Sequence, residues 1–494
     1  MTVNIHSTEH TTQAVLKMAD KPHAYSIFRG FLFAVAVGIL SYLYLIYHKT
    51  PHDEAKRLEN VLSRLLAEEQ AANVSKDLVI AVGFGSCLDL LVDGIPLMKA
   101  LNIEPPSKAR YHEDISTLQE LSEMFAFFLE QGAAVERFIS LKLLRSMVKT
   151  ADSLSGSRWA GGGNAPVMSN RFIKEGFKNV IVGAQASSKI KSFYSSNIHF
   201  SETSNGEDDI HLILEYEAGE TWGKFTASRA NRFIVHSDQN NPYIGSLESF
   251  QNVIRETPPR LVIVSALQML DNFPFEAGIR ETRMSALTDM LKETPRSTLL
   301  HFEMASFSEV AMMESILSHV IPFVDSLGMN EQELPNVVSM FQHGEITTHA
   351  DSNPRTATVL DNIRELYRHL QTRSNRGLTR IHVHTLAFQA ILLKTGSQWK
   401  NNKAGTAKAS LTAYRHVCGL DTVDVNKARL IMDESFSLSV NSEKRVYFNE
   451  SSPISCWDEE DYEICVAPVL VCTAVKQTVG GGDNITPAGL VLQI

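Results

Sequence analysis

A glycine-rich stretch close to the end of the chain carries the clearest chemical signal in the sequence. The segment Thr478–Thr486 reads Thr-Val-Gly-Gly-Gly-Asp-Asn-Ile-Thr. The glycines Gly480, Gly481 and Gly482 let the backbone approach a ligand closely, and their N–H groups can converge on a phosphate at the start of a helix. Asp483, at the edge of that cradle, is placed to accept a proton from an attacking hydroxyl. The simpler alternative is a glycine turn in which Asp483 caps a helix.

Polar residues also follow three predicted strands, 297–302, 320–326 and 380–383. They are Glu303, Asn330, Glu333, His384 and Thr385. In a parallel sheet these strand ends meet at one edge, together with the glycine stretch that follows the β-type run 466–475. Glu303 and Glu333 would then approach the phosphate cradle beside Asp483, a setting that suits Mg²⁺. Taken singly, each acid would more often be a helix cap or a solvated charge, and it is their joint position at successive strand ends that favours a functional site.

The elements that must position these residues alternate between strands and helices. Strands are predicted at 78–82, 180–182, 261–264, 297–302, 320–326 and 380–384, and helices at 52–72, 279–292, 307–317 and 357–371. This alternation indicates a mainly parallel sheet with helices on both faces.

Other segments are predicted to surround this sheet. Asp89 lies in a small-residue turn after the first strand, and Glu136 lies on a long amphipathic helix, 118–138. The strands 210–216 and 232–236 indicate a second, more antiparallel sheet. A loop contains Gly161–Asn164, and the polar stretch 395–408 is predicted to be a mobile loop.

Length and composition limit the class of protein. The chain has 494 residues, enough for two or three domains, with 44% hydrophobic and 21% charged residues as in an ordinary globular protein. A net charge of −10 argues against a nucleic-acid partner. The five cysteines form no Cys-x-x-Cys pair, so a structural zinc site is not expected. One disulfide is possible in an oxidising compartment among four of them, Cys418, Cys456, Cys465 and Cys472. The sequence does not decide which of them would pair.

The N-terminus differs from the rest. Residues 1–26 are polar and are predicted to be disordered, whereas 27–48 is apolar and contains 18 uncharged residues in a row. That length just spans a bilayer, so we expect an uncleaved signal anchor, with a cleaved signal peptide as the alternative and a buried core helix as a weaker one. Either targeting signal would direct the chain to the secretory pathway, the endoplasmic reticulum above all, with secretion as an alternative.

Eight motifs, in this order, resemble the animal type of ADP-dependent glucokinases within the ribokinase-like kinases. They are Val82-Gly-Phe-Gly-Ser-Cys-Leu-Asp89, Gly161-Gly-Gly-Asn164, Asp209-Ile-His211, Arg229-Ala-Asn-Arg-Phe233, His301-Phe-Glu303, Asn330-Glu-Gln-Glu333, Arg380-Ile-His-Val-His-Thr385 and Val479-Gly-Gly-Gly-Asp483. The similarity covers the chain from about residue 76 to its end.

The resemblance implies a kinase domain over 52–494, with a three-layer α/β/α large domain and a smaller α+β lid whose strands fall within about 190–245. It implies a sugar site for glucose formed by Asp89, Glu136, Gly162, Gly163, Asn164 and His211. It implies that Glu303, Glu333 and Asp483 bind Mg²⁺. It implies an ADP site that includes Asn330, His384, Thr385, Val471, Cys472 and Gly482, with Arg229 and Arg232 as phosphate-binding side chains from the lid.

The implied reaction is a step of glycolysis in which ADP phosphorylates glucose, giving glucose 6-phosphate and AMP. Asp483 would be the general base and Gly480–Gly482 the anion hole. We expect a monomer that meets a membrane only if the N-terminal segment is retained. Two alternatives stay open: an ATP-using sugar kinase of the same superfamily, and a membrane-tethered sugar-binding protein without activity.

Overall fold

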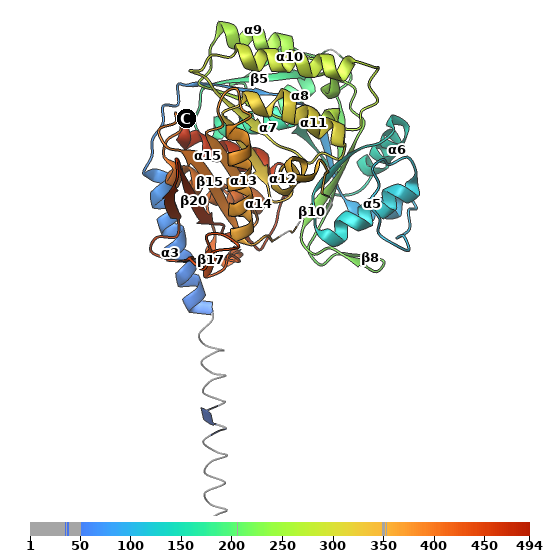
Figure 1. Cartoon of the computed structure of the whole chain (residues 1–494). Helices are drawn as coiled ribbons and strands as arrows, with labels where there is room; N and C mark the ends of the chain where they lie inside the picture. Colours follow the sequence, from blue (N-terminus) through green and yellow to red (C-terminus); the bar gives the residue numbers. More distant parts are fainter. Residues whose placement is uncertain (1–34, 36, 39–50, 205, 348–350, 352) are drawn as a thin grey trace, which may run out of the picture. The chain divides into compact units, whose positions relative to one another are not determined.

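The computed structural model describes residues 35, 37–38, 51–204, 206–347, 351 and 353–494 (Figure 1). They belong to two compact units, 1–59 and 60–494, and helix α3, Pro51–Gln70, begins in the first and ends in the second. The predicted disordered segment 1–26 lies outside the described residues, as does the predicted anchor 27–48 apart from residues 35, 37 and 38. Among the described helices, none combines the length and the apolar character that crossing a membrane requires.

A ten-stranded sheet forms the centre of the second unit, in the order β19-β20-β15-β14-β13-β12-β11-β1-β5-β6. The strands from β6 to β14 run parallel, and β15, β20 and β19 are added antiparallel at the other edge. In chain order the bounds are β1 Val79–Gly83, β5 Asn179–Ala186, β6 Ile198–Thr203, β11 Leu261–Val264, β12 Leu299–Glu303, β13 Ser326–Asn330, β14 Arg380–His384, β15 Phe388–Lys394, β19 Ser455–Glu459 and β20 Tyr462–Pro468.

Helices cover both faces of this sheet because successive side chains of each strand point to opposite sides. In β1, Ala81 packs into one apolar cluster, whereas Ile80 and Val82 pack into another. The first cluster includes side chains from α9 Leu247–Glu256, α10 Ile279–Glu293, α11 Val310–His319, α12 Glu333–His343 and α13 Thr356–Gln371. The second includes side chains from α7 Asn164–Lys174, α14 Asn402–Cys418 and α15 Gly481–Gln493.

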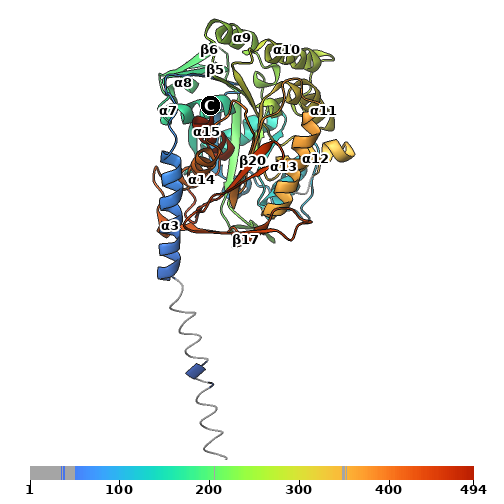
Figure 2. The same cartoon turned by 60° about the vertical axis from the view of Figure 1, so that its left-hand side comes forward.

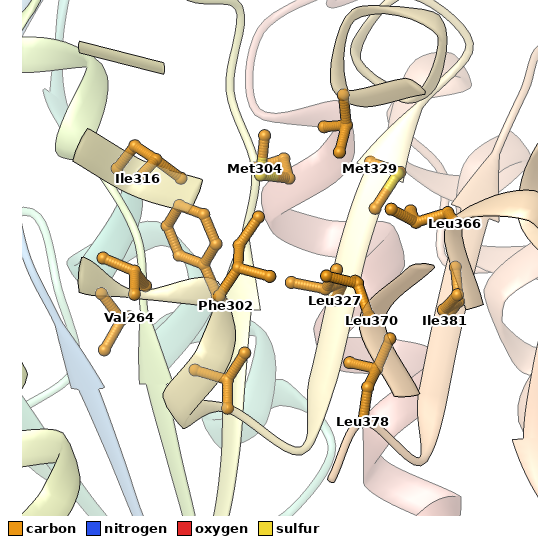
Figure 3. Packing of buried hydrophobic residues seen from close by; sticks show 14 of the residues in the cluster. Val264, Phe302, Met304, Ile316, Leu327, Met329, Leu366, Leu370, Leu378 and Ile381 are labelled. Atoms are coloured by element: carbon orange, nitrogen blue, oxygen red, sulfur yellow. The ribbon is translucent and has the colours of Figure 1, made fainter. Parts of the chain in front are cut away.

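Figure 2 shows these layers, with α14 and α15 on one side of β20 and α13 on the other. Figure 3 shows part of the first cluster from close by: Phe302 lies beside Ile316 of α11, and Leu327 and Ile381 of the following strands lie beside Leu366 and Leu370 of α13. The predicted three-layer α/β/α arrangement is therefore confirmed.

A five-stranded sheet, in the order β3-β10-β7-β2-β4, forms the smaller part of the same unit. Its strands are β2 Cys87–Asp93, β3 Val135–Phe138, β4 Arg158–Gly162, β7 Ile210–Tyr216 and β10 Asn231–His236. One face packs against α4 Gly94–Ala100, α5 Leu118–Gln131 and α6 Leu141–Asp152 around a separate apolar core. Figure 1 shows α5, α6 and β10 grouped together.

This smaller sheet differs from the sequence expectation in three ways. The predicted helix 118–138 ends at Gln131 because Gly132 adopts φ 60°, and Glu136 therefore lies on strand β3. Asp89 lies within strand β2 rather than in a turn. The strands come from 87–236, a wider stretch than 190–245, and β6 within that stretch belongs to the large sheet.

The chain passes repeatedly between the two sheets. It leaves the large sheet after β1 to form β2, β3 and β4, returns for β5 and β6, leaves again for β7 and β10, and returns at α9. The short elements are α8 Ser188–Ser192, β8 Thr221–Trp222, β9 Phe225–Thr226, β16 Ala428–Arg429, β17 Ser435–Ser437, β18 Arg445–Tyr447, β21 Val471–Cys472 and the 3₁₀ turns η1 Asn241–Tyr243, η2 Leu267–Leu270, η3 Ile321–Phe323 and η4 Val425–Lys427.

Three predictions for the C-terminal half are wrong in whole or in part. The apolar stretch 320–326 was expected to be a strand, but it contains η3, and β13 begins at Ser326. The expected mobile loop 395–408 contains the start of α14, whose small residues pack closely against α15. The β-type run 466–475 holds only the end of β20 and the short β21.

Two disulfides join the four C-terminal cysteines. Cys418 at the end of α14 is bonded to Cys472 of β21, and Cys456 of β19 is bonded to Cys465 on the neighbouring strand β20. Only one disulfide was considered from the sequence.

Candidate active site

A cleft between the two sheets collects most of the residues that the sequence singled out. It holds about 1000 Å³ of empty space, its open mouth included. From the smaller sheet it is lined by Asp89, Glu136, His211 and Arg232, and from the large-sheet side by Gly163, Asn164, Glu303, Asn330, Glu333, His384, Gly480, Gly481, Gly482 and Asp483. The predicted groups therefore face one another across one space.

The glycine stretch begins α15 at the edge of this cleft. Gly480 adopts φ 69°, a conformation that a residue with a side chain rarely takes, and α15 starts at Gly481. A Cβ at Gly481 would meet nothing within 4 Å, whereas one at Gly482 would lie 3.3 Å from His384 and 3.4 Å from Glu303. The first N–H groups of α15 are thus accessible to an anion.

Asp483 lies in the first turn of α15, where Asn164 Nδ2 donates to its Oδ1 at 2.9 Å. The carboxyl keeps part of its surface open to the cleft, yet the surrounding protein raises its pKa to about 7 by desolvation, and Glu303 and Glu136 add to this. Asn164 and Arg232 act in the opposite direction. A carboxylate with such a pKa is a suitable proton acceptor near neutral pH.

Glu303 at the end of β12 is held from three sides. Its Oε1 accepts from Thr486 Oγ1 at 3.0 Å and lies 3.4 Å from His384 Nε2, and its Oε2 lies 3.0 Å from His301 Nε2. Burial alone would raise the pKa of Glu303, but the two histidines outweigh it and lower the pKa to about 2. Glu303 is therefore an ionised, fixed carboxylate below the glycine turn.

Glu333, the first residue of α12, is bound to the end of β13. Its Oε2 accepts from the Asn330 backbone N–H and its Oε1 from Asn330 Nδ2, both at 2.8 Å. Burial raises the pKa of Glu333 to about 7, with nearby Glu303 and Glu331 adding to it. The charge of His384 acts in the opposite direction without outweighing these effects, so a cation beside Glu333 would favour its ionised form.

The oxygen groups on this side fit Mg²⁺, which takes one or two carboxylates and completes its shell with waters and phosphate oxygens. Glu303, Glu333 and Asn330 line the same part of the cleft. Within the part of the chain that the structure describes, Glu303, Glu333 and Asp483 do not converge as three ligands within 4.8 Å of one another. They match an ion that also binds a substrate phosphate rather than a closed protein cage.

The opposite wall is organised around His211 of β7. Its Nδ1 lies 3.1 Å from Glu136 Oε1, and its Nε2 lies 3.0 Å from Oδ1 of the fully buried Asp238. His236 Nδ1 approaches the same Asp238 oxygen at 3.2 Å. Burial opposes charge on these groups, but their mutual attraction prevails: the pKa of His211 is raised well above its usual value, and those of Glu136 and Asp238 are lowered.

Asp89 completes this wall beside two glycines. A Cβ on Gly162 would lie 2.0 Å from Asp89 Oδ1, and one on Gly163 would lie 2.4 Å from the backbone of Ser86. Gly162 is therefore needed for the close packing against the carboxyl, and Gly163 for the close packing against the backbone of Gly85 and Ser86. Burial raises the pKa of Asp89 to about 6, against the attraction of His211. The wall presents carboxylates and an imidazole, groups that bind sugar hydroxyls.

Two arginines that the sequence placed together lie differently. Arg232 lines the cleft, where its charge faces Asp483, and its Nη1 donates to Asn231 Oδ1 at 3.0 Å. Arg229 is not part of the cleft lining; its Nε donates to the Gly132 carbonyl at 2.7 Å, and its Nη2 to Glu331 Oε1 at 3.1 Å. Arg229 thus joins the smaller sheet's side to the turn that precedes Glu333 and α12.

Four other expected residues are also absent from the cleft lining. Gly162 packs behind Asp89 as described. Thr385 accepts through its Oγ1 from the N–H groups of Ala387 and Phe388 and so shapes the turn between β14 and β15. Val471 and Cys472 form β21, paired with β16.

Several residues of the site were missed by sequence analysis. Gln268 lines the cleft from η2, and Ile213, Ile234 and Met304–Ser306 add to its walls. Asp238 lies behind His211. Alternation along β7 and β10 could have identified Ile213 and Ile234, since they share a face with His211 and Arg232.

The chain matches a known protein family over most of its length. A model of the ADP-specific phosphofructokinase/glucokinase conserved region matches residues 78–492. An ADP-dependent glucokinase of Bos taurus is 31% identical over 419 residues, 83% of each chain. A probable ADP-dependent glucokinase of Caenorhabditis elegans is 29% identical over 427 residues, 83% of this chain and 84% of its own.

Among solved structures, an ADP-dependent kinase in complex with fructose-6-phosphate and ADPbetaS is similar over 89% of this chain and 98% of its own. The TM-score is 0.62 at 18% sequence identity, a likeness of fold.

Proposed function

The chain belongs to the ADP-specific phosphofructokinase/glucokinase family, with its ribokinase-like fold, and from that premise we propose that it is a glucokinase. The proposed reaction transfers the terminal phosphoryl group of ADP to the 6-hydroxyl of D-glucose and releases AMP. The observation that carries the proposal is the position of Asp483, at the start of α15 after three glycines and across the cleft from Asp89, Glu136 and His211.

The small-sheet wall of the cleft, formed by Asp89, Glu136 and His211, carries charges that favour an uncharged acceptor. Asp89 and Glu136 present carboxylates to the cleft, and the positive charge of His211 is already matched by Glu136 and Asp238. A sugar that already carries a phosphate would meet repulsion there, whereas glucose would meet hydrogen-bonding partners for its hydroxyls. The names of the two relatives described above favour the same acceptor.

The proposed mechanism assigns distinct tasks to the chain's residues. Asp483 accepts the proton of the attacking hydroxyl, and the N–H groups of Gly480–Gly482 with the α15 N-terminus stabilise the charge on the transferred group. Arg232 adds positive charge from the opposite wall. Glu303 and Glu333 would hold Mg²⁺, which neutralises phosphate charge when bound. Asn330 and His384 line the same cleft and would contact the nucleotide.

The donor assignment rests on family membership and on the length of the site. The transferred group must lie over the glycine turn, and the rest of the nucleotide must extend past Asn330 and His384. If that span fits two phosphates, a third would displace the reacting group and lower the rate by a factor on the order of 10² or more.

Product analysis tests the proposal. The enzyme is incubated with Mg²⁺ and with ADP, or with ATP freed of ADP, together with glucose or fructose 6-phosphate. We expect glucose 6-phosphate and AMP from ADP and glucose. A kcat/KM with pure ATP equal to that with ADP would refute the donor, and faster turnover of fructose 6-phosphate would refute the acceptor.

A further inference from the structure

The segment between β18 and β19 presents an asparagine that has no part in the proposed reaction. Asn449 begins the tripeptide Asn449-Glu450-Ser451, which has the Asn-x-Ser pattern of an N-glycosylation acceptor. Asn449 and Ser451 are both exposed. A pattern of three residues also arises by chance, so the local structure must decide whether this one is used.

The conformation of this segment occupies the amide oxygen of Asn449 and leaves the amide nitrogen available. Asn449 Oδ1 accepts a hydrogen bond from the Ser451 backbone N–H at 2.9 Å, an Asx turn. Because the backbone N–H can only donate, it must face the oxygen of the amide and not its nitrogen. Among the described residues, Asn449 Nδ2 donates no hydrogen bond, and Nδ2 is the atom to which an N-linked glycan is attached.

An exposed aromatic residue lies on the same side of the chain as Asn449. Exposed and partly buried residues alternate along 445–450, and Tyr447, with 73% of its surface exposed, is in phase with Asn449. Alternate residues of an extended segment share a face, so the two side chains point to the same side. The apolar face of a pyranose ring packs well on an aromatic ring, so a sugar on Asn449 would be within reach of Tyr447.

The cysteines of the chain suit the compartment in which N-glycans are attached. Cys418 is bonded to Cys472 and Cys456 to Cys465, and the remaining Cys87 is fully buried. Structural disulfides persist in oxidising compartments such as the lumen of the endoplasmic reticulum. The disulfides therefore provide an observation on the compartment that is independent of the Asn-x-Ser pattern.

Two other segments have the same pattern without this local structure. At Asn73-Val74-Ser75 the turn is closed through Ser75, whose Oγ accepts from the Asp77 N–H at 3.4 Å. Asn484 is only 8% exposed, and its Nδ2 donates to the Gly480 carbonyl at 2.9 Å within α15. A glycan on Asn484 would displace the glycine turn. The combined observations therefore favour Asn449.

We propose that Asn449 is an N-glycosylation site and that the first sugar of its glycan packs against Tyr447. In the transfer, Nδ2 loses a proton and forms a bond to C1 of the first sugar of a lipid-linked oligosaccharide. The bond between C1 and the diphosphate oxygen breaks, and its electron pair leaves with the lipid diphosphate. This inference does not depend on the proposed kinase reaction.

The experiment uses the full-length chain, expressed in animal cells and purified. Treatment with a peptide N-glycosidase converts each glycosylated asparagine to aspartate, and mass spectrometry of the peptides then identifies the modified residue. The variants are Asn449→Gln, Ser451→Ala and Ser451→Thr. Asn441→Gln is the matched control, because Asn441 is exposed in the same part of the chain but is followed two residues later by Glu443.

We expect a glycan on Asn449 in the wild type, in Ser451→Thr and in Asn441→Gln. Asn449→Gln and Ser451→Ala should lack it, since the first removes the acceptor nitrogen and the second removes the hydroxyl that the pattern requires. Removal of the glycan from the folded wild type should lower the equilibrium constant for folding in urea a few-fold. The same treatment of Tyr447→Ser should change it less, because the aromatic partner of the sugar is missing.

An unmodified Asn449 in wild-type protein that contains both disulfides would overturn the glycosylation site. An unmodified Asn449 in protein whose four C-terminal cysteines are free thiols would overturn it as well, because the chain would then fold in a reducing compartment. If glycan removal destabilises the wild type and Tyr447→Ser equally, the contact with Tyr447 is wrong.

Discussion

On the small-sheet wall of the cleft, Glu136 and Asp238 flank His211 and have lowered pKa values, whereas on the large-sheet wall burial raises the pKa of Asp483 and Glu333 to about 7. The first wall has matched its own charges, with Asp89 as the exception. On the second wall Glu303 is held ionised by His301 and His384, but the carboxyls of Asp483 and Glu333 are not fully compensated by its own residues. The difference indicates that the first wall is prepared for a neutral ligand and the second for a proton and a cation.

The largest effect is expected for a variant of Asp483, on the large-sheet wall of the cleft. Asp483→Asn keeps the shape of the carboxyl but cannot accept a proton, so kcat should fall about 10²- to 10⁴-fold. Glucose binding, measured by calorimetry, should change little. The exposed Asp289→Asn in α10 is the control and should retain full activity. Retention of a tenth of the wild-type kcat by Asp483→Asn would show that another group is the base.

The variant Asp238→Asn tests the pairing of charges on the small-sheet wall. Removing the negative charge leaves the His211 imidazolium poorly paired in a buried place, so the free energy of unfolding should drop by about 3 kcal/mol. Urea unfolding measures this, with the exposed Glu207→Gln as a control that should change stability little. A loss no larger than that of Glu207→Gln would mean that the charges are not matched as described.

The pH dependence of the same variant has a defined sign. Because the pKa of Asp238 is lowered in the folded protein, its stabilisation is present above its unfolded value of about 4 and is lost as pH falls below it. His211, whose pKa is raised, stabilises fully below about pH 6.5 and loses its contribution as pH rises through its folded value. The stability difference between wild type and Asp238→Asn should therefore be largest between these limits, and a difference that grows below pH 4 would contradict the assignment.

A smaller effect is expected for variants that weaken the binding of Mg²⁺. Glu303→Gln and Glu333→Gln each remove one negative oxygen group from the large-sheet wall, so the Mg²⁺ concentration for half-maximal rate should rise about 10-fold or more. Glu314→Gln on the exposed side of α11 is the matched control. Unchanged half-saturation in both cleft variants would remove them from the metal site.

The smallest effect is expected for variants of the ion pair between Arg229 and Glu331, which connects the smaller sheet to the turn before α12. The ion pair of Arg229 and Glu331 is partly exposed, with 20% and 10% of the two side chains accessible, and such a pair contributes up to about 1 kcal/mol. Arg229→Ala and Glu331→Gln should each raise the KM for glucose a few-fold. If Arg229 instead binds a phosphate, only Arg229→Ala will raise the KM for ADP.

The sequence predicted the position of a site residue best where that residue belongs to a short motif at the end of a strand or the start of a helix. Gly480–Asp483, Glu303 and Glu333 follow or begin regular elements, so their place at one sheet edge followed from strand direction alone. Glu136 was assigned to a helix because the apolar spacing of 118–131 continues past Gly132, and only the left-handed conformation of that residue ends the helix. Gln268 and Asp238 could not be predicted, because each is a single polar residue whose partner lies far away in the sequence.

Misassigned elements have a similar explanation. The stretch 395–408 is rich in small and polar residues, which is typical of loops, yet in α14 those small residues allow close packing against α15. The strand expected at 320–326 was more apolar than the real β13, which contains Gly328 close to the side chains of Glu303 and His301. Tertiary packing outweighed local composition in both places.

The repeated passage of the chain between the sheets has a consequence for protein engineering. The small-sheet wall of the cleft is encoded by two separate segments: 87–162 supplies β2, β3 and β4, and 210–236 supplies β7 and β10. Among the described strands, β3 pairs with β10 alone, and β2 is connected to β10 through β7, so neither segment by itself contains the complete sheet. A chimaera that exchanges the acceptor specificity between relatives must therefore transplant both segments together, and a single crossover within 163–209 would yield a sheet with mismatched partners.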